Sequence, residues 1–160
     1  MTEPRDRDEI RQLISTYNIE GDRGRIDAMA AVFADDAVLV LPAWRAQGRA
    51  AIAKGLSGGV FKAGSAPERR VVRHHLTTCH ITFDGEGEAH GRTYWINYSE
   101  NGPDHSGVYV DRFRCIAGAW KIVAREVRLD WRAPGSTLSD DMRVGARPEE
   151  LGPLPVITAD

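Results

Sequence analysis

Apolar residues in the first part of this chain recur at the interval expected of helices. Over Asp6–Ile19 they return every three or four positions, which predicts an amphipathic helix with Tyr17 on its buried stripe. The same spacing over Arg25–Phe33 predicts a second helix. Asp22 lies in the joint between the two, directly after a glycine, where an aspartate commonly caps the helix that follows.

Further along, the apolar spacing becomes that of strands. The continuous apolar run Ala37–Leu41 predicts a strand that ends at Pro42, and Gly48–Leu56 predicts a third, short helix. Four longer strands are predicted at Val72–Phe83, Glu88–Glu100, Ser106–Ile116 and Trp120–Trp131. Because short turns join these four segments, neighbouring strands should run antiparallel.

Helices followed by a run of strands are typical of an α+β fold. We expect a curled antiparallel sheet that forms a cone around the N-terminal helices over residues 1–132. Residues 133–160 carry four prolines in a polar context, so they are expected to form a C-terminal arm or lid of the same unit. Such a cone has one interior, where any chemistry should lie.

The strand predicted at Val72–Phe83 brings a histidine to that interior. At the two-residue period of a strand, His75 shares one face with Ile81 and Phe83, and this face should point inward. Its neighbour His74 falls on the opposite, solvated face. A buried imidazole without a partner costs about 1–3 kcal/mol, so we expect an acid beside His75. A histidine oriented by a carboxylate suits a general base, although the spacing alone favours a structural role.

The same two-residue period, applied to the other strands, identifies further polar residues that should face the interior. Arg125 falls on an apolar strand face and needs an anionic partner, either the interior Asp111 or a substrate. Tyr109 shares the face of Asp111 and either lines a pocket or belongs to the core.

Composition and charge exclude several classes of protein. The 23 acids and 21 bases are mixed along the chain and give a net charge of −2, which argues against a nucleic-acid partner. Cys79 and Cys115 are too few for a disulfide framework, and neither cysteines nor histidines have the spacing of metal ligands. No apolar run is long enough to cross a membrane, so we expect a soluble, cytoplasmic protein without a metal.

Several motifs follow one another in a recognisable order. They are Tyr17, Gly21-Asp22, Phe33-Ala34-Asp35-Asp36-Ala37-Val38, Gly48-Arg49-Ala50-Ala51-Ile52, Arg73-His74-His75, Gly107-Val108-Tyr109-Val110-Asp111 and Ala119-Trp120-Lys121-Ile122. Over about residues 8–131 this order resembles the SnoaL-like branch of the nuclear-transport-factor-like superfamily. Within that branch it is most similar to scytalone dehydratase and hexachlorocyclohexane dehydrochlorinase, which are lyases that use no cofactor.

The resemblance implies a His–Asp dyad inside a SnoaL-like α+β barrel. The family aspartate stands between the first two helices, at Asp22, and the family histidine opens the strand after the third helix, at His75. Arg125 matches an arginine of the dehydrochlorinase. Tyr17 stands where that enzyme has a lysine, and Tyr109 replaces an asparagine of the dehydratase. These departures argue against either enzyme's own reaction.

We therefore expect a cofactor-independent lyase of the dehydratase type that acts on a small, uncharged, cyclic or aromatic molecule. In this hypothesis His75 removes a proton, Asp22 orients it and Arg125 meets negative charge on oxygen, while Tyr17 and Tyr109 position the substrate. An isomerase or polyketide cyclase is a close alternative. A non-catalytic subunit of an aromatic-ring dioxygenase and a ligand-binding module are alternatives from other classes.

The outward face of the predicted sheet suggests self-association. Leu76, Val108, Val110 and Ile116 fall on that face, which makes it apolar enough to need a cover. Members of the resembled family commonly form dimers or trimers. We therefore expect a homo-oligomer.

Overall fold

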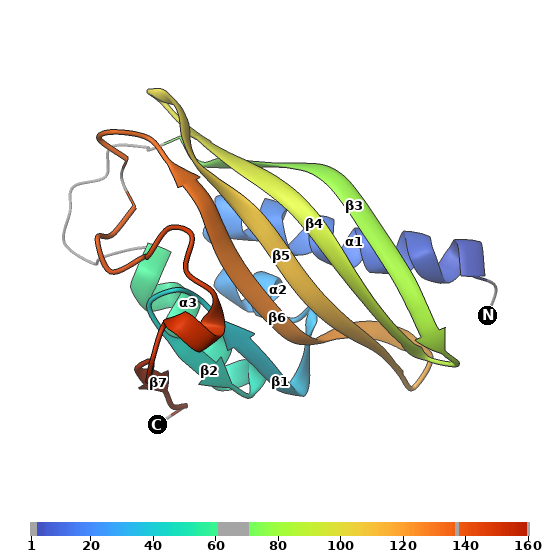
Figure 1. Ribbon diagram of the computed structural model, residues 1–160. Helices are drawn as coiled ribbons and strands as arrows, with labels where there is room; N and C mark the ends of the chain where they lie inside the picture. The colour runs from blue at the N-terminus through green and yellow to red at the C-terminus, as the bar shows by residue number, and fades with distance from the viewer. Residues whose placement is uncertain (1–2, 61–70, 137, 160) are drawn as a thin grey trace.

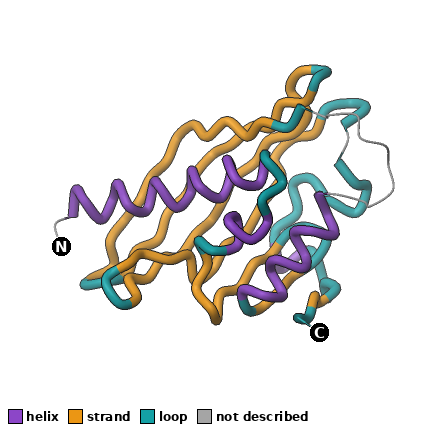
Figure 2. The backbone as a smooth tube through the Cα atoms, turned by 180° about the vertical axis from the view of Figure 1, so that it is seen from behind, coloured by secondary structure: helices purple, strands orange, loops and turns teal. Residues whose placement is uncertain are grey.

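One long helix lies across the inner face of a curled, open sheet (Figures 1 and 2). The computed structural model describes residues 3–60, 71–136 and 138–159. Its helices are α1 (Glu3–Asp22), α2 (Ile26–Ala30), α3 (Arg49–Val60) and a 3₁₀ turn at Pro148–Glu150. The two ends of the chain lie at opposite ends of the molecule (Figure 1).

The sheet contains seven strands in the described part of the chain, in the order β3-β4-β5-β6-β1-β2-β7. The strands are β1 (Phe33–Val40), β2 (Arg45–Gln47), β3 (Arg73–Gly85), β4 (Glu88–Ser99), β5 (Gly102–Ile116), β6 (Ala119–Arg132) and β7 (Val156–Ile157). The predicted α+β cone is confirmed. The sheet is not antiparallel throughout, however, because β1 runs parallel to β6 and β7 runs parallel to β2.

The core lies between the helices and the concave face of this sheet. Helix α1 packs against β3 and β6, as its three-to-four-residue apolar spacing requires. The buried side chains of α1 meet those of the strands and of α3 in this core. Its fully buried members include Ile10, Ile14, Phe33, Leu39, Ile52, Phe113, Ile122 and Leu129. A single hydrophobic core therefore fixes the end of α1 relative to the start of β3.

The second helix and the first strand differ from their predicted bounds. Helix α2 ends at Ala30, and the strand begins at Phe33, where the backbone pairs with Ile122 of β6. Asp35 and Asp36 lie inside β1 at a shift of register. Pairing with β6 here outweighs the local helical spacing, because tertiary context can override propensity.

Strand β3 contains a bulge that changes which of its residues face inward. Leu76 pairs with Trp95 and Cys79 pairs with Thr93, so Thr77 and Thr78 together oppose the single residue Tyr94. Both threonines are exposed, whereas Leu76 and Cys79 pack against the core. The alternation of faces is therefore displaced by one residue on the N-terminal side of the bulge.

A second shift of register lies at the start of β5. Asn97 of β4 pairs with His105, and the next residue, Tyr98, pairs with Pro103, so Asp104 is the extra residue. Asp104 is buried, and the neighbouring side chain of His105 is only partly exposed. The two adjacent polar side chains are thus both withdrawn from solvent, which a regular strand would not allow.

The C-terminal arm returns to the sheet after β6. Its Ala133 N–H donates to the carbonyl oxygen of Asp104 at 2.8 Å, and Gly145 N–H donates to that of Leu129 at 2.7 Å. Strand β7 then extends the sheet beyond β2.

Candidate functional site

The last residue of α1, Asp22, contacts a histidine at the start of β3. Asp22 Oδ1 lies 2.6 Å from Nδ1 of His74, and Oδ2 accepts the backbone N–H of the same residue at 2.8 Å. The carboxylate is 7% exposed and the imidazole 24%. Because a carboxylate only accepts hydrogen bonds, Nδ1 of the neutral ring carries the hydrogen, and Nε2 is left for another partner.

The predicted contact of His75 with Asp22 is wrong by one residue. His75 is exposed and packs edge-on against Tyr98, with 5.1 Å between the ring centroids. Counting alternate residues back from Ile81 and Phe83 crosses the bulge at Thr77–Thr78, and this reverses the faces of His74 and His75. Asp22 therefore contacts a histidine of the predicted strand, but this histidine is His74 and not His75.

The alternative role of Asp22 as a helix cap is also not observed. Helix α1 continues through Asp22, and the N-cap position of α2 is occupied by Arg25, which makes no side-chain capping bond. Both oxygens of Asp22 instead bond to His74. The carboxylate is therefore available to orient the imidazole.

A second His–Asp pair, missed in the sequence, lies at the bulged start of β5. Nδ1 of His105 lies 2.6 Å from Oδ1 of Asp104, and Ser136 of the C-terminal arm donates its hydroxyl to the same oxygen at 2.6 Å. The pair was missed because Asp104 lies between the predicted strands, in the segment expected to form a turn. In addition, adjacent residues of a regular strand point to opposite faces, so no contact between Asp104 and His105 was expected. The signal that could have revealed the pair is the Gly102-Pro103 step just before it, which is typical of an irregular strand start.

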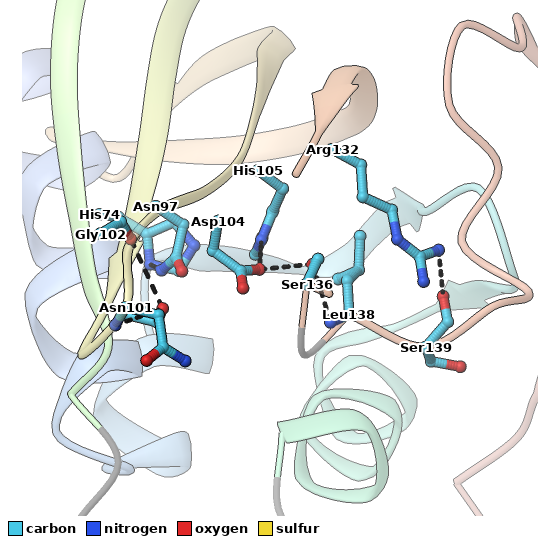
Figure 3. Close-up of polar contacts among 11 residues, drawn as sticks. His74, Asn97, Asn101, Gly102, Asp104, His105, Arg132, Ser136, Leu138 and Ser139 are labelled. Carbon is cyan, nitrogen blue, oxygen red and sulfur yellow. Dashed lines mark hydrogen bonds and ion pairs between the residues drawn. The ribbon is translucent and has the colours of Figure 1, made fainter. Parts of the chain in front are cut away.

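The two histidines belong to one cluster, part of which is drawn in Figure 3. Their ring centroids are 6.2 Å apart, and the indole of Trp95 lies 5.6 Å from His74 and 5.5 Å from His105. Asn97, which is buried, approaches Nδ1 of His74 at 3.5 Å. Side chains from α1, β3, β4, β5 and the arm thus meet at one place.

The second histidine is held in its neutral form. Burial lowers the pKa of His105 below its ordinary value, the hydrogen bond to Asp104 opposes this shift, and the nearby His74 adds to it. With its Nδ1 hydrogen directed at Asp104, the neutral ring keeps Nε2 as an acceptor. The cluster therefore combines two imidazoles with two carboxylates, and each carboxylate is bonded to a ring nitrogen.

Arg125 makes the interior ion pair that the sequence allowed as an alternative. Its Nε and Nη2 donate to the two oxygens of Asp111, each at 2.7 Å, and both side chains are fully buried. The guanidinium carbon lies 4.3 Å from the ring centroid of Tyr17 and 4.2 Å from that of Tyr109. Arg125 is thus enclosed between two rings and paired with a carboxylate, which does not favour the predicted contact with substrate oxygen.

Tyr17 and Tyr109 are core residues beneath the histidine cluster. The rings contact each other edge-on at 5.8 Å, and the hydroxyl of Tyr109 donates to Asn18 at 2.9 Å. Burial raises the pKa of both phenols, so both stay protonated. Tyr109 also stacks on Trp95 at 5.4 Å and an interplanar angle of 22°, which connects the buried ion pair to the cluster.

An open hollow of about 620 Å³ lies elsewhere, beside α2 and the start of α3. Its lining includes Asp27, Asp35, Arg49 and several alanines, but neither histidine of the cluster. Arg49 in this hollow is paired with Asp35 at 2.9 Å. Because no histidine lines this hollow and its arginine is paired with Asp35, we place the candidate site at the histidine cluster instead.

No group of three or more His, Cys, Asp or Glu side chains within residues 3–60, 71–136 and 138–159 is arranged to hold a metal ion. No helix in the same part of the chain is long and apolar enough to cross a membrane.

Solved structures with the same fold include enzymes and an enzyme subunit. A structure described as a putative scytalone dehydratase from Novosphingobium aromaticivorans is 24% identical, with 89% of this chain and 94% of that chain covered and a TM-score of 0.71. A hexachlorocyclohexane dehydrochlorinase from Novosphingobium barchaimii is 18% identical, with coverages of 81% and 90% and a TM-score of 0.69.

The third structure is the β subunit of a putative aromatic-ring-hydroxylating dioxygenase from Novosphingobium aromaticivorans. It is 17% identical, with coverages of 82% and 94% and a TM-score of 0.66. At these identities the three likenesses show a common fold alone. A search of curated proteins found no significant match to the chain.

The family assignment rests on a comparison with family models. The model of the SnoaL-like domain matches residues 2–126, which is most of the chain and includes α1 to β5 with both His–Asp pairs. The resemblance inferred from the order of motifs is thereby confirmed. This chain belongs to the SnoaL-like domain family.

Proposed function

We propose that this protein is a cofactor-independent lyase of the dehydratase type, acting on a small, uncharged, cyclic or aromatic hydroxy ketone. The observation that carries the proposal is the contact of His74 with Asp22. The buried carboxylate bonds to Nδ1 of the partly exposed imidazole through one oxygen and accepts the backbone N–H of His74 with the other. This arrangement is suited to a general base. Both cluster carboxylates are already bonded to histidines, which does not favour a cationic substrate.

His74 is the base in this mechanism. Its Nε2 removes a proton from the carbon next to the substrate carbonyl, while Asp22 keeps the hydrogen on Nδ1 and stabilises the imidazolium that forms. The imidazolium then returns the proton to the departing hydroxyl group. The carbon–oxygen bond breaks, water leaves and a conjugated double bond remains, so His74 ends the cycle neutral and no other reactant is needed.

His105 orients the leaving group. It is neutral and keeps its hydrogen on the side of Asp104, so Nε2 accepts a hydrogen bond from the substrate hydroxyl. Arg125 has no part in this mechanism, because Asp111 and the two tyrosine rings enclose it. The developing charge on the carbonyl oxygen therefore requires a different donor.

Separate substitution of the two adjacent histidines, His74 and His75, tests the proposal. His74→Asn should lower turnover of scytalone or simpler cyclic β-hydroxy ketones at least ~100-fold, because it removes the base. His75→Asn is the matched control, and it should leave the rate near that of the wild type because this ring lies outside the cluster. The rate is followed by the near-ultraviolet absorbance of the conjugated ketone, after circular dichroism has established that each variant folds.

Wild-type turnover by folded His74→Asn would contradict the mechanism. Binding of ring compounds by the wild-type protein without any product would favour the alternative of a ligand-binding module. Co-purification with an iron–sulfur large subunit would favour the dioxygenase subunit. Assembly into a homo-oligomer also stays a prediction, although Leu76, expected on the outer face, in fact packs inward.

A further inference from the structure

The indole of Trp95 carries a buried hydrogen-bond donor that lacks an acceptor in the described part of the chain. Trp95 is 4% exposed, and its Nε1 has no hydrogen-bond partner among the described residues. A buried N–H that remains unpaired destabilises the folded state, so such groups are rare in folded proteins and call for an explanation.

A second tryptophan of the chain shows the usual arrangement. Trp120 is also 4% exposed, but its Nε1 donates to Asp6 Oδ1 at 3.0 Å. The other buried nitrogen without a partner in the described chain is Nη1 of Arg125, whose guanidinium lies against two tyrosine rings. Trp95 differs from both, because its ring lies beside the two histidines of the cluster.

Packing alone holds the indole in place. One face stacks on Tyr109, and the six-membered ring lies over Gly107, where an added Cβ would come within 2.9 Å of Trp95 Cζ2. His74 and His105 contact the same indole at 5.6 Å and 5.5 Å. Packing therefore fixes the position of the N–H, and the described residues provide no acceptor for it. This is expected of a preorganised donor for a ligand.

We infer that Trp95 Nε1–H is the donor that binds the carbonyl oxygen of the ligand in the histidine cluster. An indole N–H is neutral and can only donate, so it selects a neutral acceptor such as a ketone. The inference rests on the proposed function, and it names the donor that the proposed mechanism lacks. As His74 removes the neighbouring proton, charge develops on that oxygen and strengthens this hydrogen bond.

The ligand class follows from the donors and acceptors of the cluster. The N–H of Trp95 takes the carbonyl oxygen, and Nε2 of the neutral His105 takes the hydrogen of a hydroxyl group. A ring compound that carries both a ketone and a hydroxyl group satisfies the two together. A deoxygenated analogue leaves the indole N–H unpaired and should bind more weakly.

The experiment compares two probes that differ at one group, acetophenone and ethylbenzene. Their dissociation constants are measured by titration while the indole ¹⁵N–¹H signals of the tryptophans are recorded, assigned by the single Trp→Phe variants. Wild-type protein should bind acetophenone at least ~5-fold more tightly than ethylbenzene, which is the value of one hydrogen bond. The Trp95 indole signal should move on addition of the ketone, while that of Trp120, already bonded to Asp6, should not.

Two variants separate the hydrogen bond from the ring. Trp95→Phe keeps an aromatic side chain without the N–H and should bring the two dissociation constants within about twofold of each other. Trp120→Phe removes an equally buried indole away from the cluster and should keep the wild-type preference. A preference retained by Trp95→Phe, an unmoved Trp95 signal, or the binding of neither probe would overturn the inference.

These readouts do not depend on turnover. Dehydration of hydroxy ketones by the wild-type protein without a response of Trp95 would remove this inference and leave the proposed function standing. A responding Trp95 in a protein that forms no product would remove the proposed reaction and leave the carbonyl site standing.

Discussion

Arg125 is a charge that the molecule encloses completely. Asp111 binds it through two oxygens, and the rings of Tyr17 and Tyr109 cover it, so its positive charge is balanced only within the core. Its pKa is raised above the ordinary value by the carboxylate of Asp111 in spite of burial, and the guanidinium remains charged. Stability therefore depends on the partner staying in place.

Asp111→Ala should destabilise the protein by about 3–5 kcal/mol, because it leaves a buried charge without its partner. Asp36→Ala is the control. It breaks a surface pair with Arg114 in which the carboxylate is 68% exposed, and it should cost less than about 1 kcal/mol. Urea denaturation measures both values, and equal costs would argue that the interior pair contributes no more than a surface one.

His105 should make stability depend on pH. Its folded-state pKa lies below the ordinary value of 6.5, so as the pH falls the unfolded chain binds a proton before the folded one does. The stabilisation by this group is complete above pH 6.5 and is lost progressively below it.

His105→Asn should therefore lose less stability than the wild type when the pH falls from about 7 to about 5. Thermal unfolding across this range measures the two slopes. The absolute stability of the variant also reflects the loss of the bond to Asp104, so the comparison rests on the slopes. Parallel slopes would show that His105 titrates alike in the folded and unfolded chains.

At the scale of single residues, only one member of the contact between Asp22 and His74 could be predicted from the sequence. Asp22 could be predicted from its place between two helices, because the aspartate of the resembled family stands there. His74 could not, because a bulge adds one residue and leaves no mark in a pattern of alternating residues. His105 was missed for the same reason, since a shift of register buries it beside Asp104.

At the scale of elements, two irregularities in register produce the cluster. The bulge at Thr77–Thr78 turns His74 inward, and the shift at Asp104 brings Asp104 and His105 to one side. Bulges are common beside functional sites because they change the direction of a side chain without moving the strand. The middle of β5 shows a related constraint at Gly107, next to a further shift in its pairing with β6.

Gly107→Ala should destabilise the protein by about 2 kcal/mol or more, because overpacking forces backbone and ring to move. The new Cβ would lie 1.9 Å from the carbonyl oxygen of Arg128 and 2.9 Å from Trp95 Cζ2. Ser106→Ala, one residue earlier, adds no such clash and should be close to neutral. Denaturant unfolding of the two variants checks this expectation, and an equally small effect of both would contradict the close packing of Trp95.

Most elements could be predicted from their spacing, and the exceptions have physical causes. Strands β3 to β6 follow the predicted segments closely because each is a long segment bounded by short turns. The short strands β2 and β7, of three and two residues, carry too few positions for any period to emerge. The parallel pairing of β1 with β6 joins residues far apart in the chain, which no local pattern reports.

At the scale of the whole molecule, the cone was predictable because helices come first and long strands follow. One sheet that curls around α1 is a natural way to bury such a sequence in a single core. The contribution of the C-terminal arm was not predictable, because it depends on individual contacts. Ser136 reaches Asp104 across 32 positions, and nothing in the local sequence of the arm reports this.

The hydrogen bond from Ser136 to Asp104 allows the C-terminal arm to affect His105 without contacting it. The match to the family model ends at residue 126, and Ser136 lies beyond it, yet its hydroxyl shares an oxygen of Asp104 with His105. Gain or loss of one hydroxyl there alters the proton affinity of the imidazole by way of the carboxylate. Under the proposed mechanism, we therefore expect relatives with the same fold and different tails to differ in their pH optimum even where the residues that contact the ligand are the same.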